Sequence, residues 1–271
     1  MITLLNGENW AIEEIIANMY DDEFYYNTLN ITKALSASSL KDLLNAPENF
    51  LKQLKGKKEK SSEALRLGSL VHWLYLEPEK FYSLKFIEAD RTNSKVYTEA
   101  VKEFGADKVY KVKDQRLAEY WVDILNNKET LKSIRDKCEA EIPMIKTLSG
   151  IPIRGKADLL DDNCIYDLKT TRVNPKDFNW WKVRDFDYDL QAFIYCQLFE
   201  RDYFSFIPIN KMNGRPGLVH CSKDVLQSGE DKFYKAIEIY KTQFQGKTLE
   251  EISDALSMHL DETIISKPKK Q

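Results

Sequence analysis

The chain has 271 residues, of which 43% are hydrophobic and 31% charged, and its formal net charge at pH 7 is −3. These values are ordinary for a globular protein with a sizeable core, and the slightly acidic balance argues against unspecific binding of polyanions. The start of the chain lacks the pattern of a signal peptide, and no apolar run reaches transmembrane length. We therefore expect a cytoplasmic protein without membrane contact.

Residues 1–32 are expected to form a helical arm around Trp10–Tyr20, followed by an aromatic and acidic stretch with no evident chemistry. A second helix is expected over Leu35–Leu44, with Ser36 or Ser38 as its N-cap. Capping alone explains both serines. A helix N-terminus with hydroxyl groups also binds phosphate, so both interpretations stay open.

The next helix, Ser61–Leu76, carries Gly68 and His72 one turn apart on the same face. A lone histidine on a helix is more often a structural residue than a ligand. Arg66 of the same helix is either a phosphate contact or a surface ion-pair partner. Residues 81–137 follow as a mostly helical segment, which we expect to cap one side of a sheet.

A strand over Cys138–Thr147 contains Glu141, which either lies near a site or faces solvent. Two further strands, Arg154–Leu160 and Cys164–Thr170, are joined by the polar turn 161–163.

Side chains alternate along a strand, so Asp167 and Lys169 share one face, while Leu168 points into a core. Asp158 of the preceding strand can lie beside them. Carboxylates suit Mg²⁺ or Mn²⁺, and a lysine can orient or deprotonate a water molecule, which together would serve phosphodiester hydrolysis. The competing interpretation is an ordinary solvated strand face.

The segment Pro175–Tyr188 is rich in aromatic and basic residues, which suits either a DNA strand or a helix-packing seam. Gln191 and Tyr195 lie on one face of the following helix, Asp189–Phe199. The four scattered cysteines form no C-x-x-C pair and indicate neither a zinc nor an iron–sulfur site.

The motif G-K-A-D-(x)8-D-L-K-T-T, from Gly155 to Thr171, resembles the core motif of the PD-(D/E)XK nuclease superfamily, with Ala157 where proline is frequent. The segment A-L-R-L-G-S-L-V-H-W-L-Y-L-E-P resembles a helix of RecE-like exonucleases, and Q-x-x-x-Y after the hairpin is a further signature of this group. Over roughly 31–208 the chain is thus similar to the RecE-like exonuclease VIII C-terminal domain, lambda exonuclease and RecB-type nucleases.

This resemblance implies an α/β, restriction-endonuclease-like fold with a mixed central sheet flanked by helices and helical additions. We expect one nuclease domain over 1–271. It would consist of the arm 1–32, a core 33–210 with the helical cap 81–137, a C-terminal strand and helices over 211–262, and a disordered basic tail over 263–271.

The resemblance also implies site residues. Asp158 and Asp167, with His72 and Glu141, would hold one or two Mg²⁺ (or Mn²⁺) ions, and Lys169 would help to activate water. DNA contacts would come from Ser36, Ser38, Arg66, Gln191 and Tyr195.

The implied activity is processive 5′→3′ degradation of linear double-stranded DNA, which leaves 3′ single strands for annealing recombination of phage or prophage type. The implied partners are DNA ends, a RecT-like annealing protein and further copies of the chain in a ring, within a bacterial host cell. Two alternatives stay open: a RecB-like single-strand nuclease or endonuclease without an iron–sulfur cluster, and a non-catalytic DNA-end-binding protein of the same fold. The complete set Asp158, Asp167 and Lys169 argues against the latter.

Overall fold

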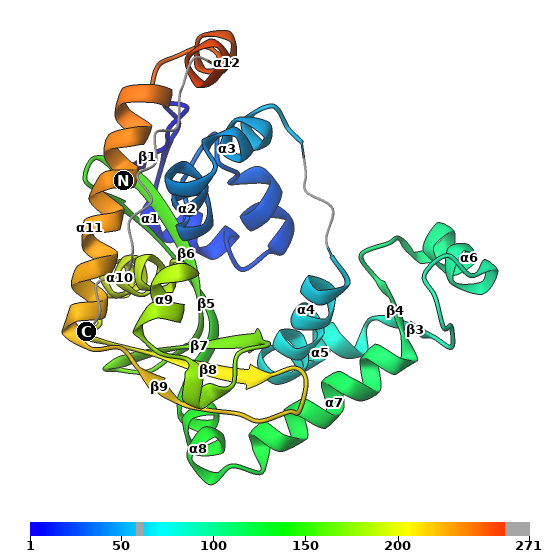
Figure 1. Cartoon of the computed structure of the whole chain (residues 1–271). Coiled ribbons are helices and arrows are strands. Elements are labelled where there is room, and N and C mark those ends of the chain that lie inside the picture. Colours follow the sequence, from blue (N-terminus) through cyan, green and yellow to red (C-terminus); the bar gives the residue numbers. More distant parts are fainter. Residues whose placement is uncertain (58–61, 258–271) are drawn as a thin grey trace, which may run out of the picture.

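A mixed five-stranded sheet forms the centre of the molecule (Figure 1). In the computed structural model, which describes residues 1–57 and 62–257, its order is β5-β6-β7-β8-β9. β7 and β8 run parallel, and the other neighbours are antiparallel. The strands are β5 (Glu139–Leu148), β6 (Ile151–Leu160), β7 (Cys164–Thr171), β8 (Tyr203–Asn210) and β9 (Val219–His220). The α/β fold with a mixed sheet is confirmed.

Burial follows from the position of each strand in the sheet. β8 is buried at every residue except its first, as expected for a strand with helices on both faces. β5 and β9 are the edge strands, and β5 is only partly buried. The motif from Gly155 to Thr171 lies on β6 and β7, two of the three inner strands.

Helices cover both faces of the sheet (Figure 1). One group surrounds the core that contains Leu35, Ile194 and Phe206. It comprises α2 (Ala37–Asn45), α3 (Pro47–Leu54), α10 (Tyr188–Phe199), α11 (Lys223–Ile239), the π-helix η3 (Tyr240–Phe244) and α12 (Leu249–Ser257). The other group packs around Trp121 and Leu168. It comprises α4 (Glu63–Leu76), α5 (Pro78–Tyr82), α7 (Val112–Asn126) and α8 (Glu129–Lys137).

Within the region expected to be a helical cap, a small lobe projects from the second group of helices (Figure 1). It consists of α6 (Lys95–Phe104) and the parallel strands β3 (Lys85–Ile87) and β4 (Val109–Lys111). The short connection between β7 and α10 holds the 3-10 turn η2 (Pro175–Asp177) and α9 (Trp180–Asp185). No helix in the described ranges is long and apolar enough to cross a membrane.

The N-terminal arm is part of the folded body. It contains a hairpin of β1 (Ile2–Thr3) and β2 (Asn9–Trp10), then α1 (Ile12–Asn18) and the π-helix η1 (Phe24–Thr28). Ile15, Met19 and Leu29 are fully buried and share a cluster with Ile145 of β5. At the other end of the chain, the expected basic tail 263–271 and the last residues of the expected final helix lie outside the described residues.

Candidate active site

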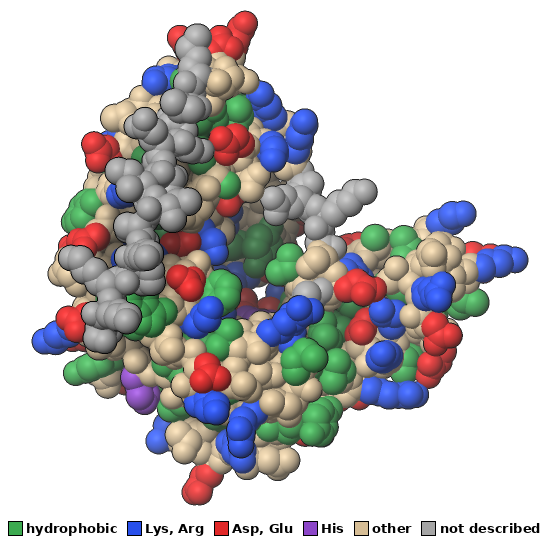
Figure 2. Space-filling model, in the orientation of Figure 1, with side chains coloured by type: hydrophobic (Ala, Val, Ile, Leu, Met, Phe, Trp, Pro, Cys, Tyr) green, Lys and Arg blue, Asp and Glu red, His purple; other side chains and the backbone are tan. Residues whose placement is uncertain are grey.

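A groove of about 1000 Å³ runs between the arm and α2 on one side and α4 on the other. Figure 2 shows the molecule hollowed at this place. Eight of the ten site residues predicted from the sequence line the groove, namely Ser36, Ser38, His72, Glu141, Asp158, Lys169, Gln191 and Tyr195. A ninth, Asp167, is buried with 2% exposure and contacts two of them. Only Arg66 lies away from the groove.

Glu141, Asp158 and His72 converge at the floor of the groove. The pairing of Ala140 with Leu159 and of Ile142 with Ala157 places Glu141 directly opposite Asp158. His72 comes from α4, and its Nδ1 lies 3.5 Å from an Asp158 carboxylate oxygen. One ligand atom from each of the three lies within 4.8 Å of the others.

The backbone is irregular where these side chains meet. Glu141 has a φ of 55°, which a non-glycine residue in a strand rarely adopts and which is typical of functional sites. The hydrogen-bonded ladder between β6 and β7 ends at Leu159 and Tyr166. Beyond this point, an Asp158 carboxylate oxygen accepts a hydrogen bond of 2.7 Å from the backbone N–H of Leu168. The two central strands therefore separate at the carboxylates.

Asp167 is held from two sides. The side-chain amide of Gln191 donates to Oδ1 at 2.7 Å, and Nζ of Lys169 lies 2.7 Å from Oδ2. Nζ of Lys169 also lies 5.0 Å from the centre of the Tyr188 ring. The alternation predicted for β7 thus brings Asp167 and Lys169 together, and α10 adds the amide and the aromatic ring.

Close packing of α4 on the sheet brings His72 to this place. A β-carbon on Gly68 would come within 2.9 Å of Oγ1 of Thr170 at the end of β7. The absence of a side chain at Gly68 therefore lets the helix approach the strand.

The clustered carboxylates raise one another's pKa values. Burial and the nearby charges of Asp158 and Glu77 raise the pKa of Glu141 to about 8. Burial and the charge of Asp167 raise the pKa of Asp158 well above its ordinary value. Burial lowers the pKa of His72, so this imidazole is neutral near pH 7 and has a free nitrogen for a ligand.

These residues fit a divalent metal ion. Oδ2 of Asp167 is buried, and no described donor meets it at a hydrogen-bonding angle, although the Lys169 ammonium lies beside it. Three carboxylates and a neutral imidazole form a donor set for Mg²⁺ or Mn²⁺. The same carboxylates repel one another when they are ionised, and a cation would relieve this repulsion.

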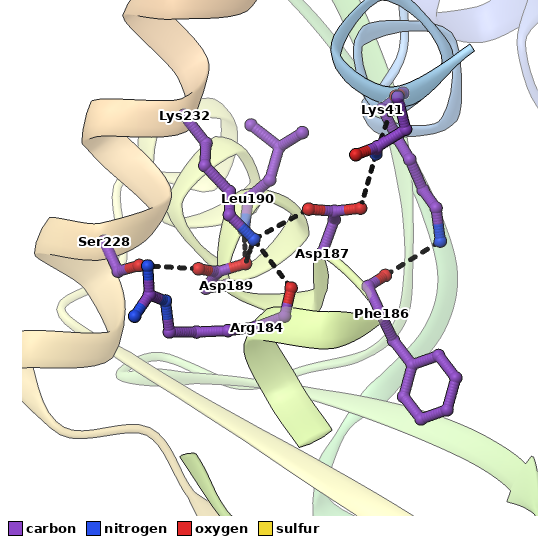
Figure 3. A network of polar contacts seen from close by, with 9 residues as sticks. Lys41, Arg184, Phe186, Asp187, Asp189, Leu190, Ser228 and Lys232 are labelled. Carbon is purple, nitrogen blue, oxygen red and sulfur yellow. Dashed lines mark hydrogen bonds and ion pairs between the residues drawn. The ribbon is translucent and has the colours of Figure 1, made fainter. Parts of the chain in front are cut away.

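The connection between α9 and α10 is fixed by a partly buried polar network (Figure 3). Lys232 of α11 donates to the carboxylates of Asp187 and Asp189 at 2.7 and 2.9 Å, and to the carbonyl of Arg184 at 2.8 Å. Lys41 of α2 donates to the carbonyl of Phe186 at 2.9 Å. Because α10 begins here, the network sets where its first turn presents Tyr188 and Gln191.

Ser36 is the N-cap of α2, and its side chain accepts from the backbone N–H of Ser39. The hydroxyl of Ser38 lies 2.9 Å from that of Ser36, and both line the groove. Capping is thus established for Ser36, and the position of both serines is compatible with a bound phosphate.

Four basic groove residues were not predicted, namely Lys41, Arg154, Lys156 and Lys211. Arg154 and Lys156 are 6% and 8% exposed and lie on the same face of β6 as Asp158, four and two residues before it. The Arg154 guanidinium stacks on Tyr25 at 4.4 Å, its Nε has no acceptor within the described residues, and it forms no ion pair there. The period-two alternation that grouped Asp167 with Lys169 would have found Arg154 and Lys156.

Two remaining predicted residues have packing contacts. Two guanidinium nitrogens of Arg66 donate to the carbonyls of Ala106 and Val109, and the group stacks on Tyr110 at 4.1 Å. Arg66 therefore anchors the projecting lobe and is left out of the proposed DNA contacts. Tyr195 lines the groove and packs against β6, where a β-carbon on Gly155 would come within 3.0 Å of its ring.

Comparisons with known proteins agree with this architecture. A family model described as "PDDEXK-like domain of unknown function (DUF3799)" matches residues 36–251. No curated protein matches the chain. A structure from Eubacterium rectale described as a "Putative exonuclease" superimposes with a TM-score of 0.62 at 17% identity, over 91% of this chain and 96% of its own. An alkaline exonuclease from Laribacter hongkongensis aligns with a TM-score of 0.37 at 12% identity, over 90% and 98% of the two chains.

Proposed function

Because this chain belongs to the DUF3799 family of PDDEXK-like domains, we propose that it is a metal-dependent deoxyribonuclease that acts on the ends of linear DNA. The observation that carries the proposal is the convergence of His72, Glu141 and Asp158, next to the pair Asp167–Lys169, in one groove. The carboxylates and the neutral imidazole of this set are ligands for a metal ion, so hydrolysis by an activated water molecule is the chemistry that the residues support.

Each residue has a distinct part in this chemistry. Asp158, Asp167, Glu141 and His72 would hold one or two Mg²⁺ ions. When bound, such ions supply Lewis acidity and offset the charge that develops on the phosphoryl and leaving oxygens. The side-chain amide of Gln191 orients the Asp167 carboxylate.

Lys169 lies where it can hold the attacking water. Burial alone would lower its pKa, but the charges of Asp167 and Asp158 outweigh burial and raise it. The ammonium therefore stays protonated in this arrangement. In that form it donates hydrogen bonds and offsets negative charge, so we assign it to orienting water and stabilising the transition state.

The basic end of the groove supports action at DNA ends. Arg154 is buried and has no carboxylate partner in the part of the chain that the structure describes, and Ser36 and Ser38 offer the N-terminus of α2 to the same groove. A phosphate group could accept hydrogen bonds both from Arg154 and from the N-terminus of α2 with its two serines. The exonuclease description of the E. rectale protein points the same way. We therefore propose 5′→3′ degradation of duplex DNA from a terminal phosphate. A RecT-like annealing partner, a ring assembly and a phage or prophage origin remain further proposals from the resemblance.

Digestion of end-labelled linear duplexes tests the function. With Mg²⁺, we expect stepwise loss of a 5′ label, no attack on closed circular DNA, and no cleavage by Asp167→Ala. Cutting of circles would instead assign an endonuclease. DNA-end binding without any cleavage in Mg²⁺ or Mn²⁺ would assign a non-catalytic end-binding protein.

A further inference from the structure

We propose that the N-terminal arm forms a wall of the groove on which an unpaired nucleobase stacks, with Tyr26 as the platform. This inference rests on the proposed function only in that the groove binds DNA. The family match begins at residue 36, so the arm lies outside it. Even so, the arm contributes Asp22, Tyr25 and Tyr26 to the lining of the groove.

A partly buried group of charges joins the arm to β6, the strand that carries Asp158. The Asp22 carboxylate bridges two lysines, with contacts of 2.7 Å to Lys80 of α5 and 2.9 Å to Lys156 of β6. The Lys156 side chain is only 7% exposed, and its ammonium also lies 3.8 Å from a Glu141 carboxylate oxygen. One lysine thus joins the arm to the metal-ligand set, which places the arm's aromatic side chains beside the chemistry.

The two neighbouring tyrosines have different environments. Tyr25 is 5% exposed and covers the cationic groups of Arg154 and Lys156 at 4.4 and 5.0 Å. Tyr26 is 59% exposed, and its ring meets that of Tyr25 edge to face at 4.9 Å and 83°. The buried tyrosine therefore supports the exposed ring. Both belong to the π-helix η1, a rare conformation that occurs frequently at functional sites.

The charges around Tyr26 favour a nucleotide as its occupant. The Lys156 ammonium lies 5.8 Å from the centre of the Tyr26 ring, and Arg154 lies two residues before Lys156 on the same face of β6. Cations beneath an aromatic platform suit a chain of phosphates that carries flat bases. The bases inside a duplex have both faces covered by their neighbours, whereas every base of an unpaired strand can offer a face to a tyrosine, so an unpaired nucleotide is the occupant that fits this ring best. Stacking accepts every base, so we expect little sequence preference.

Binding of a short single-stranded phosphorothioate oligonucleotide in Mg²⁺ tests the platform without requiring cleavage. We expect Tyr26→Ala to weaken the Kd about 10- to 100-fold and Tyr26→Phe to leave it nearly unchanged. Tyr20→Ala is the matched control, because Tyr20 lies on the same arm with 55% exposure but outside the groove lining. Thermal melts of all variants exclude unfolding as the cause.

An abasic residue moved stepwise along the oligonucleotide identifies the contact. At one position of the strand, removal of the base should weaken binding to the wild-type protein as much as Tyr26→Ala weakens binding of the intact strand. The Tyr26→Ala variant should bind this abasic strand no more weakly than it binds the intact strand. An equal effect of Tyr26→Ala on abasic and intact strands at every position would overturn the inference, as would normal binding by Tyr26→Ala. If the protein binds in this base-dependent way but cleaves no DNA, the inference about Tyr26 holds and the proposed nuclease activity is wrong.

Discussion

The orientation of the Asp167 carboxylate depends on Gln191, a residue outside the hairpin motif. Gln191 donates to one of its oxygens from α10, while Lys169 lies beside the other. Hydrogen bonds of this kind orient a carboxylate toward a metal and keep it from turning away.

Gln191→Ala should weaken both Mn²⁺ affinity and DNA cleavage by about 10- to 100-fold, because the Asp167 carboxylate would lose its fixed orientation. Titration calorimetry with Mn²⁺ and a cleavage assay measure the two effects. Gln197→Ala, on the exposed side of the same helix, is the control. Wild-type metal affinity in Gln191→Ala would refute the orienting role.

The raised pKa of Glu141 gives stability a pH dependence. A carboxyl group whose pKa is about 8 in the folded state, against 4.5 ordinarily, binds a proton more tightly when folded. This contribution is complete below about pH 4.5 and is lost as the pH rises through about 8. The raised pKa of Asp158 acts in the same direction.

The metal-free protein should therefore melt at a lower temperature at about pH 9 than at about pH 7, a range in which His72 is largely neutral in both states. Mg²⁺ should reverse the loss, because it binds the ionised carboxylates of the folded state. Glu141→Gln should reduce the pH dependence. A pH dependence as steep in Glu141→Gln as in wild type would exclude Glu141 as its source.

At the scale of residues, the sequence predicted which side chains meet in the groove better than it predicted what packs around them. Asp158, Asp167 and Lys169 could be identified because strand alternation and the D-x-K spacing are local. Arg154 and Lys156 obey the same alternation, but Arg154 precedes the motif and Lys156 was given no role within it. The lack of an acceptor for Nε of Arg154 among the described residues depends on what packs around it, and a sequence does not give that.

At the scale of elements, α10 and α11 cross unusually closely. A methyl group on Gly229 of α11 would overlap the backbone carbonyl of Asp189 and come within 2.9 Å of the β-carbon of Phe193. The same contact region holds the Lys232 network that fixes the start of α10 (Figure 3).

Gly229→Ala should therefore destabilise the protein by about 1–3 kcal/mol, although alanine is the better helix former by about 1 kcal/mol. Urea unfolding measures the difference, and Lys235→Ala on the exposed face of α11 should change stability by less than about 0.5 kcal/mol. A stability gain in Gly229→Ala would show that the helices can move apart without cost.

Most long helices and strands were predicted from periodicity, whereas β1, β2 and β4 were not. Strands of two or three residues are too short to show an alternating pattern. Their pairing depends on segments distant in the chain, as when β4 pairs with β3. The arm packs on the core through a hydrophobic cluster that includes Ile145. Its place in the groove wall also involves the Asp22–Lys156 ion pair, which joins residues far apart in the chain and which no local pattern encodes.

At the scale of the whole molecule, a net charge of −3 coexists with a groove whose walls carry Arg154, Lys156, Lys169 and Lys211. Charge gathered in a concave site attracts a polyanion far more than the average charge suggests. The carboxylates on the floor require cations before DNA can approach, so metal binding and DNA binding should support each other.

The central claim is that Lys169 and the metal-binding carboxylates hydrolyse DNA together. The most direct measurement is single-turnover cleavage of a linear duplex, with and without Mg²⁺, by wild type and by Lys169→Met, with Mn²⁺ affinity measured in parallel. We predict no cleavage in EDTA, full cleavage in Mg²⁺, and a rate about 10²- to 10⁴-fold lower for Lys169→Met with its metal affinity retained. Cleavage by Lys169→Met at the wild-type rate, or cleavage by wild type in EDTA, would contradict the claim.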